Sequence, residues 1–227
     1  MTARDDLLRH ACAVAAGNGS GADPRLLRQG VDPATARRAA VLMLFGVLDD
    51  VPAVSPLDLV AADLDVLLLE RATTLNSHPG QVAFPGGSID PGDATTADAA
   101  LREAQEETGL DPAGVEVLGV MPELAIPHSN FLVKPVLAWW AAPSPIRVVD
   151  PAESAQVFRI PVRDLLAPDN RVTVTVAGRE RLPGTPGFLV NGVVVWGFTA
   201  MILDHLFAQL GWAVPWDAGR GHVLSLE

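Results

Sequence analysis

A glycine pair followed by an acidic helical stretch constrains this chain more than any other feature. The pair occupies positions 86–87, and residues 102–109 read Arg-Glu-Ala-Gln-Glu-Glu-Thr-Gly. Glu103, Glu106 and Glu107 stand three and four residues apart, so a helix would carry all three on one face. Like charges at this spacing destabilise an isolated helix by roughly 0.2–0.5 kcal/mol per pair. A divalent cation would reverse that penalty, because carboxylate oxygens suit Mg²⁺ or Mn²⁺.

The surrounding residues predict that this stretch is an amphipathic helix. The positions on the side away from the glutamates are small or mostly apolar, and such a stripe can pack on a sheet; they are Ala97, Leu101, Ala104 and Thr108. Asp93 or Thr95 can cap the start of the helix, and Gly109 stands where a glycine commonly ends one. A solvated acidic helix is the ordinary alternative for a run of charges. The glycine pair at a fixed distance upstream favours a functional site instead.

Together these residues resemble the Nudix box, in which Gly, five residues and an acid precede Arg-Glu-x-x-Glu-Glu-x-Gly. Gly87 and Asp93 supply the first spacing, although the generic box has Glu at the second position. Eight residues, 94–101, then precede Arg102, where the generic box has seven. The additional residue resembles the coenzyme A pyrophosphatase branch of the Nudix hydrolases. The resemblance implies an α/β fold, a Nudix-type α/β/α sandwich with a mixed sheet, and a pyrophosphatase that hydrolyses phosphoric anhydride bonds.

A second segment, residues 67–87, is similar to the element that precedes the box in coenzyme A pyrophosphatases. The matching positions are Arg71, Ala72, Gly80, Val82, Ala83 and the run 84–87. Leu69 stands where the branch has Thr, and Asn76 stands where it has Arg. An arginine binds phosphate through paired hydrogen bonds, so losing one puts the exact substrate in doubt more than the chemistry.

The C-terminal third carries weaker matches to the same branch. Residues 195–200 resemble a Trp-Gly-x-Thr-Ala segment, for which packing of Trp196 against the last helix is the favoured explanation. Residues 150–153 resemble the acidic stretch before the final strand. Relatives commonly carry acids at the places of Gln156 and Arg159, which leaves Glu153 as the candidate carboxylate from this region.

Pyrophosphate hydrolysis requires charge neutralisation and an activated water, and a bound Mg²⁺ or Mn²⁺ supplies both. We expect Glu106 and Glu107 to be the primary metal ligands, with Glu103 a ligand or the group that orients the water. The resemblance adds the backbone carbonyl of Gly86. Arg102 lies one turn before Glu106 and is expected to hold that carboxylate.

Substrate contacts are expected from a small set of residues near the box: Arg71, His78, Gly86, Gly87 and Lys134, the only lysine. Glycine allows the backbone to approach a phosphate closely. A lone histidine is more often a packing or surface residue, and this is the favoured interpretation of His78 and His128. Cys12 has no partner motif, so a cysteine nucleophile is not expected.

Composition narrows the classes of partner. The net charge of −11 argues against general nucleic-acid binding, because phosphate neutralisation needs basic patches. The single cysteine excludes an internal disulfide and fits the cytoplasmic location that we expect. No run approaches the roughly 18 apolar residues of a membrane span. We therefore expect a small-molecule nucleotide substrate, no nucleic acid and no membrane. The oligomeric state is open, with a homodimer as the candidate.

Two regions are expected: a helical N-terminal extension over residues 1–36 and a Nudix hydrolase domain over 37–227. Apolar runs predict strands at 39–48, 66–71, 115–121, 132–140 and 172–176, and a further element from 157–161. Asn191-Gly192 predicts a hairpin turn between 188–190 and 193–196, and residues 199–210 a closing helix.

The expected reaction is cleavage of coenzyme A or acyl-coenzyme A to 3′,5′-ADP and (acyl-)4′-phosphopantetheine. Hydrolysis of ADP-ribose, NADH or another dinucleotide is the near alternative. A Nudix-fold nucleotide sensor without catalysis is the alternative from another class, and the intact acidic triad argues against it.

Overall fold

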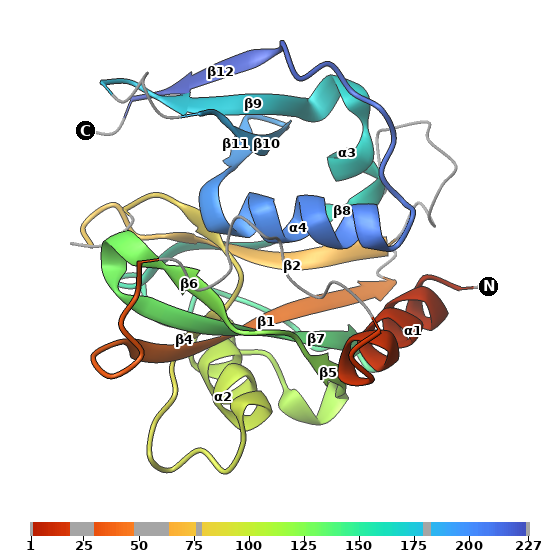
Figure 1. Cartoon of the computed structure of the whole chain (residues 1–227). Coiled ribbons are helices and arrows are strands. Elements are labelled where there is room, and N and C mark those ends of the chain that lie inside the picture. Colours follow the sequence, from red (N-terminus) through yellow and green to blue (C-terminus); the bar gives the residue numbers. More distant parts are fainter. Residues whose placement is uncertain (1, 19–29, 48–63, 76–78, 179–182, 226–227) are drawn as a thin grey trace.

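A mixed sheet lies between helices, with a second, smaller sheet beyond them (Figure 1). The structure, a computed structural model, describes residues 2–18, 30–47, 64–75, 79–178 and 183–225. The described elements are α1 (Ala3–Ala15), β1 (Arg37–Val47), β2 (Leu64–Arg71), β3 (Val82–Ala83), β4 (Gly86–Ser88), α2 (Thr96–Thr108), η2 (Pro112–Gly114), β5 (Val115–Val120), β6 (Leu124–Ile126), η3 (Pro127–Ser129), β7 (Phe131–Trp140), β8 (Ser154–Pro161), α3 (Val162–Leu166), η4 (Pro168–Asn170), β9 (Arg171–Val176), β10 (Thr185–Val190), β11 (Val193–Val195), α4 (Gly197–Gln209) and β12 (Gly221–Leu224).

The larger sheet is mixed, as predicted. Among the described residues it contains eight strands, with the order β3-β2-β1-β7-β5 and with β4, β6 and β8 pairing with β1, β7 and β2. β1 and β7 run parallel, and β2 and β4 run antiparallel to β1. β1 therefore connects the glycine pair in β4 to the centre of the sheet.

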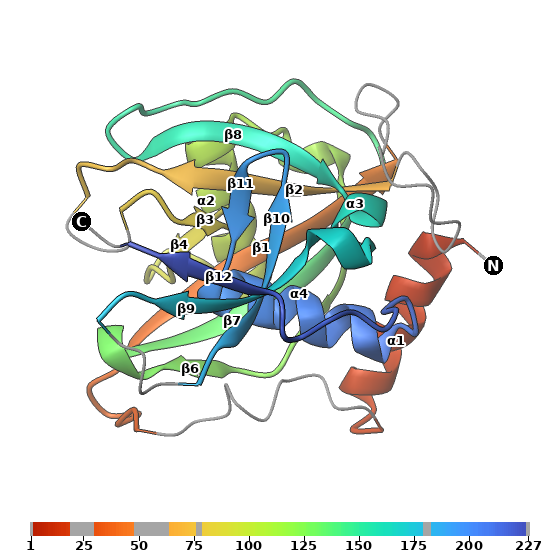
Figure 2. The same ribbon diagram turned by 90° about the horizontal axis from the view of Figure 1, so that it is seen from above.

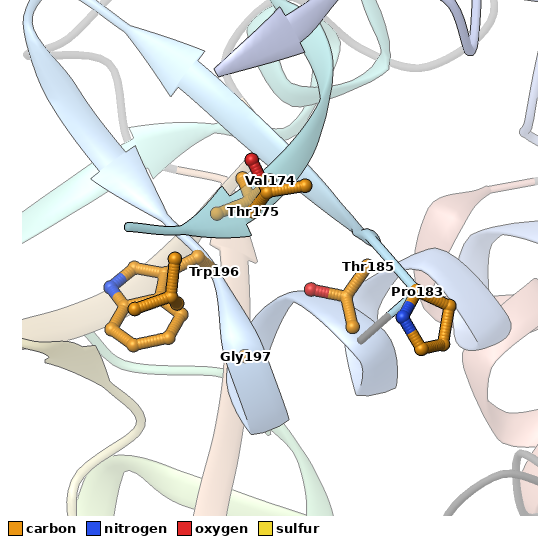
Figure 3. Close-up of a pocket in the computed structure, with 7 residues that line it drawn as sticks. Val174, Thr175, Pro183, Thr185, Trp196 and Gly197 are labelled. Carbon is orange, nitrogen blue, oxygen red and sulfur yellow. The ribbon is translucent and has the colours of Figure 1, made fainter. Parts of the chain in front are cut away.

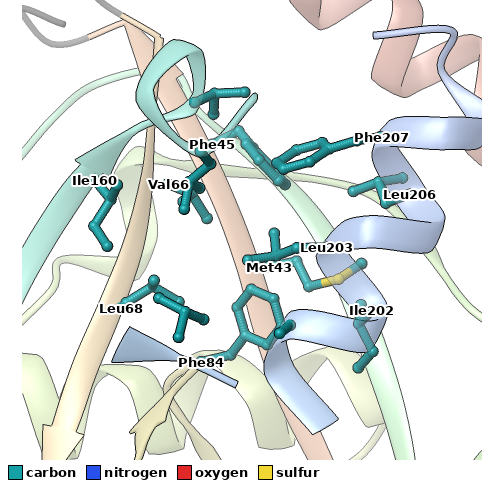
Figure 4. Close-up of a cluster of buried hydrophobic side chains, with 14 of the residues drawn as sticks. Met43, Phe45, Val66, Leu68, Phe84, Ile160, Ile202, Leu203, Leu206 and Phe207 are labelled. Carbon is teal, nitrogen blue, oxygen red and sulfur yellow. The ribbon is translucent and has the colours of Figure 1, made fainter. Parts of the chain in front are cut away.

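Alternating side chains of the central strand supply both cores, because successive residues of a strand point to opposite faces. Ala40, Leu42 and Leu44 pack with α2 on one face. Met43 and Phe45 point to the other face, where Figure 4 shows them beside the apolar side chains of α4. The helices on both faces agree with the predicted sandwich.

The second sheet was not predicted as a separate unit. It has the order β11-β10-β9-β12 among the described residues. The predicted hairpin is confirmed, since Asn191 and Gly192 both have positive φ angles between β10 and β11. β12, which pairs in parallel with β9, has no counterpart in the sequence prediction. The predicted strands and the closing helix are otherwise confirmed, with ends shifted by a few residues.

The N-terminal helix is attached to the rest of the molecule. α1 packs beside β5 and the end of α4, as both ribbon views show (Figures 1 and 2). Arg4 pairs with Glu116, and Trp212 Nε1 donates to Asp6 Oδ2 at 3.2 Å. The division of the chain at residue 36 stays a prediction. No described helix combines the length and the apolar character needed to span a membrane.

Candidate active site

α2 begins and ends through local hydrogen bonds that its sequence encodes. Thr95 is the N-cap, and its hydroxyl accepts a hydrogen bond from the Asp98 backbone N–H at 3.1 Å. Gly109 ends the helix with a left-handed φ of 69°, which glycine adopts without a Cβ penalty. Of the two predicted caps, the structure therefore selects Thr95.

The buried face of α2 differs from the predicted one. Ala104 and Thr108 are buried as expected, whereas Ala97 and Leu101 are only partly buried. Glu107 is buried instead, with 8% of its surface exposed. Glu107 lies three residues after Ala104, at the edge of the buried stripe, where the Gly86 backbone N–H faces its carboxylate. The three glutamates therefore have different environments.

The carboxylate of Glu107 is fixed to the glycine loop. Its Oε2 accepts a hydrogen bond from the Gly86 backbone N–H at 2.8 Å. Burial raises the pKa of Glu107 to about 7, opposed by the Gly86 hydrogen bond. The Glu103 and Glu153 carboxylates raise this pKa further, and Arg71 lowers it. These four groups thus act on one buried carboxylate.

Glu103 lies against the second glycine of the loop. A Cβ atom added to Gly87 would lie 2.4 Å from Glu103 Oε2, so any side chain there would displace this carboxylate. Burial raises the pKa of Glu103, and its hydrogen bond with Arg102 lowers it. The side chain of Glu106, by contrast, is 58% exposed.

Arg102 joins α2 to the loop before it. Its Nε and Nη2 donate to the two carboxylate oxygens of Asp93 at 3.0 and 3.1 Å, and Nη2 also donates to the Ser88 carbonyl. Nη1 contacts Glu103 at 3.0 Å and Glu106 at 3.1 Å. The predicted contact between Arg102 and Glu106 is confirmed. The hydrogen bonds from Arg102 hold the pKa of Asp93 below its usual value.

Asp93 has a function that the sequence analysis missed. It anchors the guanidinium of Arg102 rather than capping the helix. The fixed spacing between the glycine pair, Asp93 and Arg102 was the available signal.

Arg71 and Glu153 meet at the ends of neighbouring strands. Arg71 ends β2 and pairs with Ser154 of β8, and the Ala72 N–H donates to the Glu153 carbonyl at 2.9 Å. Arg71 Nε is buried, with no hydrogen-bond partner among the described residues. Both side chains influence the pKa of Glu107. The structure therefore places a cation and a further carboxylate near the glutamates of α2.

Of the remaining predicted substrate contacts, Lys134 lies in the described part of the chain. Lys134 lies on β7 opposite Ala40 of β1, and Ala40 pairs in turn with Gly87. Lys134 is therefore two strands away from the glycine loop. His78 and Asn76 lie outside the described residues, as does the side chain of His128.

One departure from the branch pattern has a structural explanation. Arg159 lies 4.0 Å from the carboxylate of Asp65, which is fully buried on β2. A buried carboxylate favours a nearby cation. Gln156 faces Glu70 across the same strand pair, at an exposed position.

The donor chemistry of the site fits a divalent cation. Glu103 and Glu107 are neighbouring, largely buried carboxylates whose charges repel, and a hard cation would remove that repulsion. In the described part of the chain, however, no three acidic, histidine or cysteine side chains converge closely enough to hold a metal. Arg102 binds both Glu103 and Glu106. The assignment of Glu103, Glu106, Glu107 and the Gly86 carbonyl as ligands stays a prediction.

Comparison with known proteins identifies the family. The family model described as "NUDIX domain" matches residues 50–175. This chain belongs to the Nudix family. It is 37% identical over 146 residues to "Uncharacterized Nudix hydrolase NudL" from Cronobacter sakazakii and 39% identical over 146 residues to a protein of the same name from Salmonella paratyphi B. Each alignment covers 64% of this chain and 75% of the relative.

Solved structures include other Nudix proteins. A Nudix hydrolase from M. smegmatis, RenU, has 26% identity and a TM-score of 0.42 over 56% of this chain and 71% of its own. As a Nudix hydrolase, the protein hydrolyses pyrophosphate bonds in small-molecule nucleotide substrates. Nudix hydrolases generally use divalent metal ions.

Proposed function

We propose that this Nudix hydrolase cleaves coenzyme A or acyl-coenzyme A to 3′,5′-ADP and (acyl-)4′-phosphopantetheine, with Mg²⁺ or Mn²⁺. The observation that carries the hydrolase chemistry is the Glu107 carboxylate fixed on the Gly86 amide, beside Glu103. Support for the coenzyme A part comes from residues 67–87 and from the additional residue in the box.

In this proposal Glu106, Glu107 and Glu103, with the Gly86 carbonyl, hold the cation. When bound, the cation neutralises phosphoryl charge and lowers the pKa of the attacking water. Arg102 positions Glu103 and Glu106 through its hydrogen bonds.

The substrate contacts follow from the two glycines and a nearby cation. Gly86 and Gly87 present backbone without side chains to the pyrophosphate. Arg71, at the end of β2, supplies a guanidinium for a phosphate. Glu153 is the exposed carboxylate that could accept a proton from the water. His78 and Lys134 stay predicted substrate contacts.

A direct comparison of substrates tests the proposal. With Mg²⁺ or Mn²⁺, kcat/KM for coenzyme A should exceed that for ADP-ribose by at least about tenfold, or about 1.4 kcal/mol of transition-state discrimination. Dephospho-coenzyme A reports whether the 3′-phosphate contributes. The variant Asn76→Arg should improve use of coenzyme A if that position faces the ligand. Hydrolysis of ADP-ribose with coenzyme A left intact would contradict the substrate assignment and leave the metal chemistry standing.

The second candidate is hydrolysis of ADP-ribose, NADH or another dinucleotide. Asn76 favours it, because this chain lacks the arginine that coenzyme A pyrophosphatases carry there. A nucleotide sensor without catalysis would show binding but no turnover of any of these compounds. A cytoplasmic location and a homodimer stay predictions, and sedimentation analysis would test the second.

A further inference from the structure

A cavity of about 150 Å³ lies between the second sheet and the start of α4 (Figure 3). Its lining comes from β9, β10 and the residues that open α4: Val174, Thr175, Val176, Pro183, Thr185, Trp196 and Gly197. Among the described residues, none that lines the cavity is charged, and none belongs to the candidate active site. The described lining of the cavity therefore differs in residue type from the acidic site around Glu107.

The chemistry of the lining selects an aliphatic ligand. In the described lining, a nucleobase would find only two hydroxyls, of Thr175 and Thr185, and the Trp196 indole N–H as side-chain partners for its polar edge. A hydrocarbon chain gains free energy from burial against Val, Pro and Trp side chains. An apolar cavity of about 150 Å³ holds a group about the size of benzene, so a short acyl chain would fit.

The start of α4 adds a group that suits a carbonyl oxygen. Gly197 is the first residue of the helix and lines the cavity, and the helix has no side-chain cap. Backbone N–H groups in the first turn of a helix have no partner within the helix. A Cβ at Gly197 would meet nothing within 4 Å, so the space beside its Cα is open.

The start of α4, which lines the cavity, is joined to the segment before the glycine loop by one hydrogen bond. Thr199, in the first turn of α4, donates from its hydroxyl to the Val82 carbonyl at 3.0 Å. Val82 begins β3 and precedes Gly86 by four residues, a span of at most about 14 Å. The Arg71 N–H binds the carbonyl of Gln81, the residue before Val82. A long flexible arm that leaves the pyrophosphate site beside Arg71 would follow β3 toward the start of α4.

We propose that this cavity binds the acyl end of an acyl thioester substrate and thereby selects its chain length. The inference rests on the proposed coenzyme A specificity. It assigns a recognition function to Trp196 and the second sheet, where the sequence alone favoured simple packing for Trp196.

Steady-state kinetics over coenzyme A, acetyl-, butyryl- and hexanoyl-coenzyme A test the selection. In the wild type, KM for a short acyl thioester should be at least about tenfold below that for free coenzyme A. Thr185→Leu adds bulk at the cavity wall and should abolish this advantage without changing KM for free coenzyme A. Val223→Leu, on the exposed part of β12, is the control and should behave like the wild type. A chain-length profile that Thr185→Leu leaves unaltered, or no preference in the wild type, overturns the proposal.

A binding measurement separates this inference from the proposed function. S-hexanoyl pantetheine has the acyl thioester but no pyrophosphate, and it can be titrated into metal-free protein while tryptophan fluorescence is recorded. The wild type should show a saturable change that Trp196→Phe and Thr185→Leu both lose. If coenzyme A compounds are not hydrolysed but this binding is seen, the proposed function fails and the acyl site stands. If they are hydrolysed and the binding is absent, only the acyl site fails.

Discussion

Two adjacent glycines determine how closely the carboxylates of α2 approach the backbone. A Cβ at Gly87 would contact mainly the Glu103 carboxylate, the far end of a flexible side chain. A Cβ at Gly86 would lie 2.3 Å from the Ala40 carbonyl oxygen and 2.6 Å from Val41 Cα, both in the backbone of β1. Side chains can turn away at low cost, whereas the central strand cannot.

The two alanine variants should therefore differ. Gly87→Ala should displace Glu103 and reduce kcat, with the melting temperature close to that of the wild type. Gly86→Ala should lower both kcat and the melting temperature. With this substitution β4 must move away from β1, and the amide that binds Glu107 moves with it. Parallel melting curves and kinetics would check this, and equal destabilisation by both substitutions would contradict it.

Removing the charge of one buried glutamate tests the metal chemistry. Glu107→Gln keeps the side-chain shape and can still accept the Gly86 hydrogen bond, but it loses the ligand charge. We expect kcat to fall by at least about 100-fold, or about 2.7 kcal/mol, at saturating metal. The control is Glu116→Gln. Glu116 lies on β5 and forms an exposed ion pair with Arg4 of α1, so this variant should retain activity. Near-wild-type turnover by Glu107→Gln would exclude this carboxylate as a ligand.

For single residues, the sequence predicted which side chains lie close together but not how deeply each one is buried. The spacing of Glu103, Glu106 and Glu107 places them side by side on a helix. The position of the sheet then decides that Glu107 is enclosed and Glu106 exposed. That position depends on contacts between α2 and β4, and no local sequence pattern predicts these contacts.

Among the elements, α1 illustrates the same limit. Its helical character was readable from the sequence, whereas its packing against β5 and α4 depends on single contacts such as Arg4–Glu116. His10 of α1 is half-buried, and both burial and the nearby His205 of α4 hold its pKa below the ordinary value of 6.5. Asp6 lies one turn earlier on α1, and Asp204 precedes His205.

Acid should therefore weaken the attachment of α1. A histidine with a lowered pKa in the folded state binds its proton more readily when the chain unfolds. Its contribution to stability is present above pH 6.5 and is lost as the pH falls through that value. His10→Gln should reduce the drop in melting temperature between pH 7.5 and pH 5.5, whereas His222→Gln on β12 should not. An equal drop in both variants and the wild type would argue against this interface as the acid-sensitive element.

For the whole molecule, the sequence predicted the strands better than their assignment to sheets. Residues 172–176 alternate Val and Thr, and Asn191-Gly192 marks a turn, so both strand signals were local. The pairing of β9 with β12 joins segments about 50 residues apart and has no local signal. A buried side chain of β9 contacts the neighbouring elements and helps to fix the position of the second sheet.

That side chain is Arg171, with 1% of its surface exposed. Its guanidinium lies 4.5 Å from the centre of the Phe188 ring and 4.6 Å from that of Trp216, and it pairs with Asp204 of α4. One residue thus joins β9, β10, α4 and the segment before β12. The second sheet should depend on it for its position.

Arg171→Met keeps much of the apolar stem but removes the charge, so the ion pair with Asp204 is lost and the two rings lose the cation beside them. We expect the free energy of unfolding to fall by about 2–4 kcal/mol, as for other buried pairs broken on one side. Urea denaturation followed by tryptophan fluorescence measures this. Arg9→Met removes an exposed pair with Asp6 on α1 and should change stability by about 0.5 kcal/mol or less. A loss of similar size in the two variants would mean that the second sheet is held by its apolar contacts with α4, and that Arg171 is not what fixes its position.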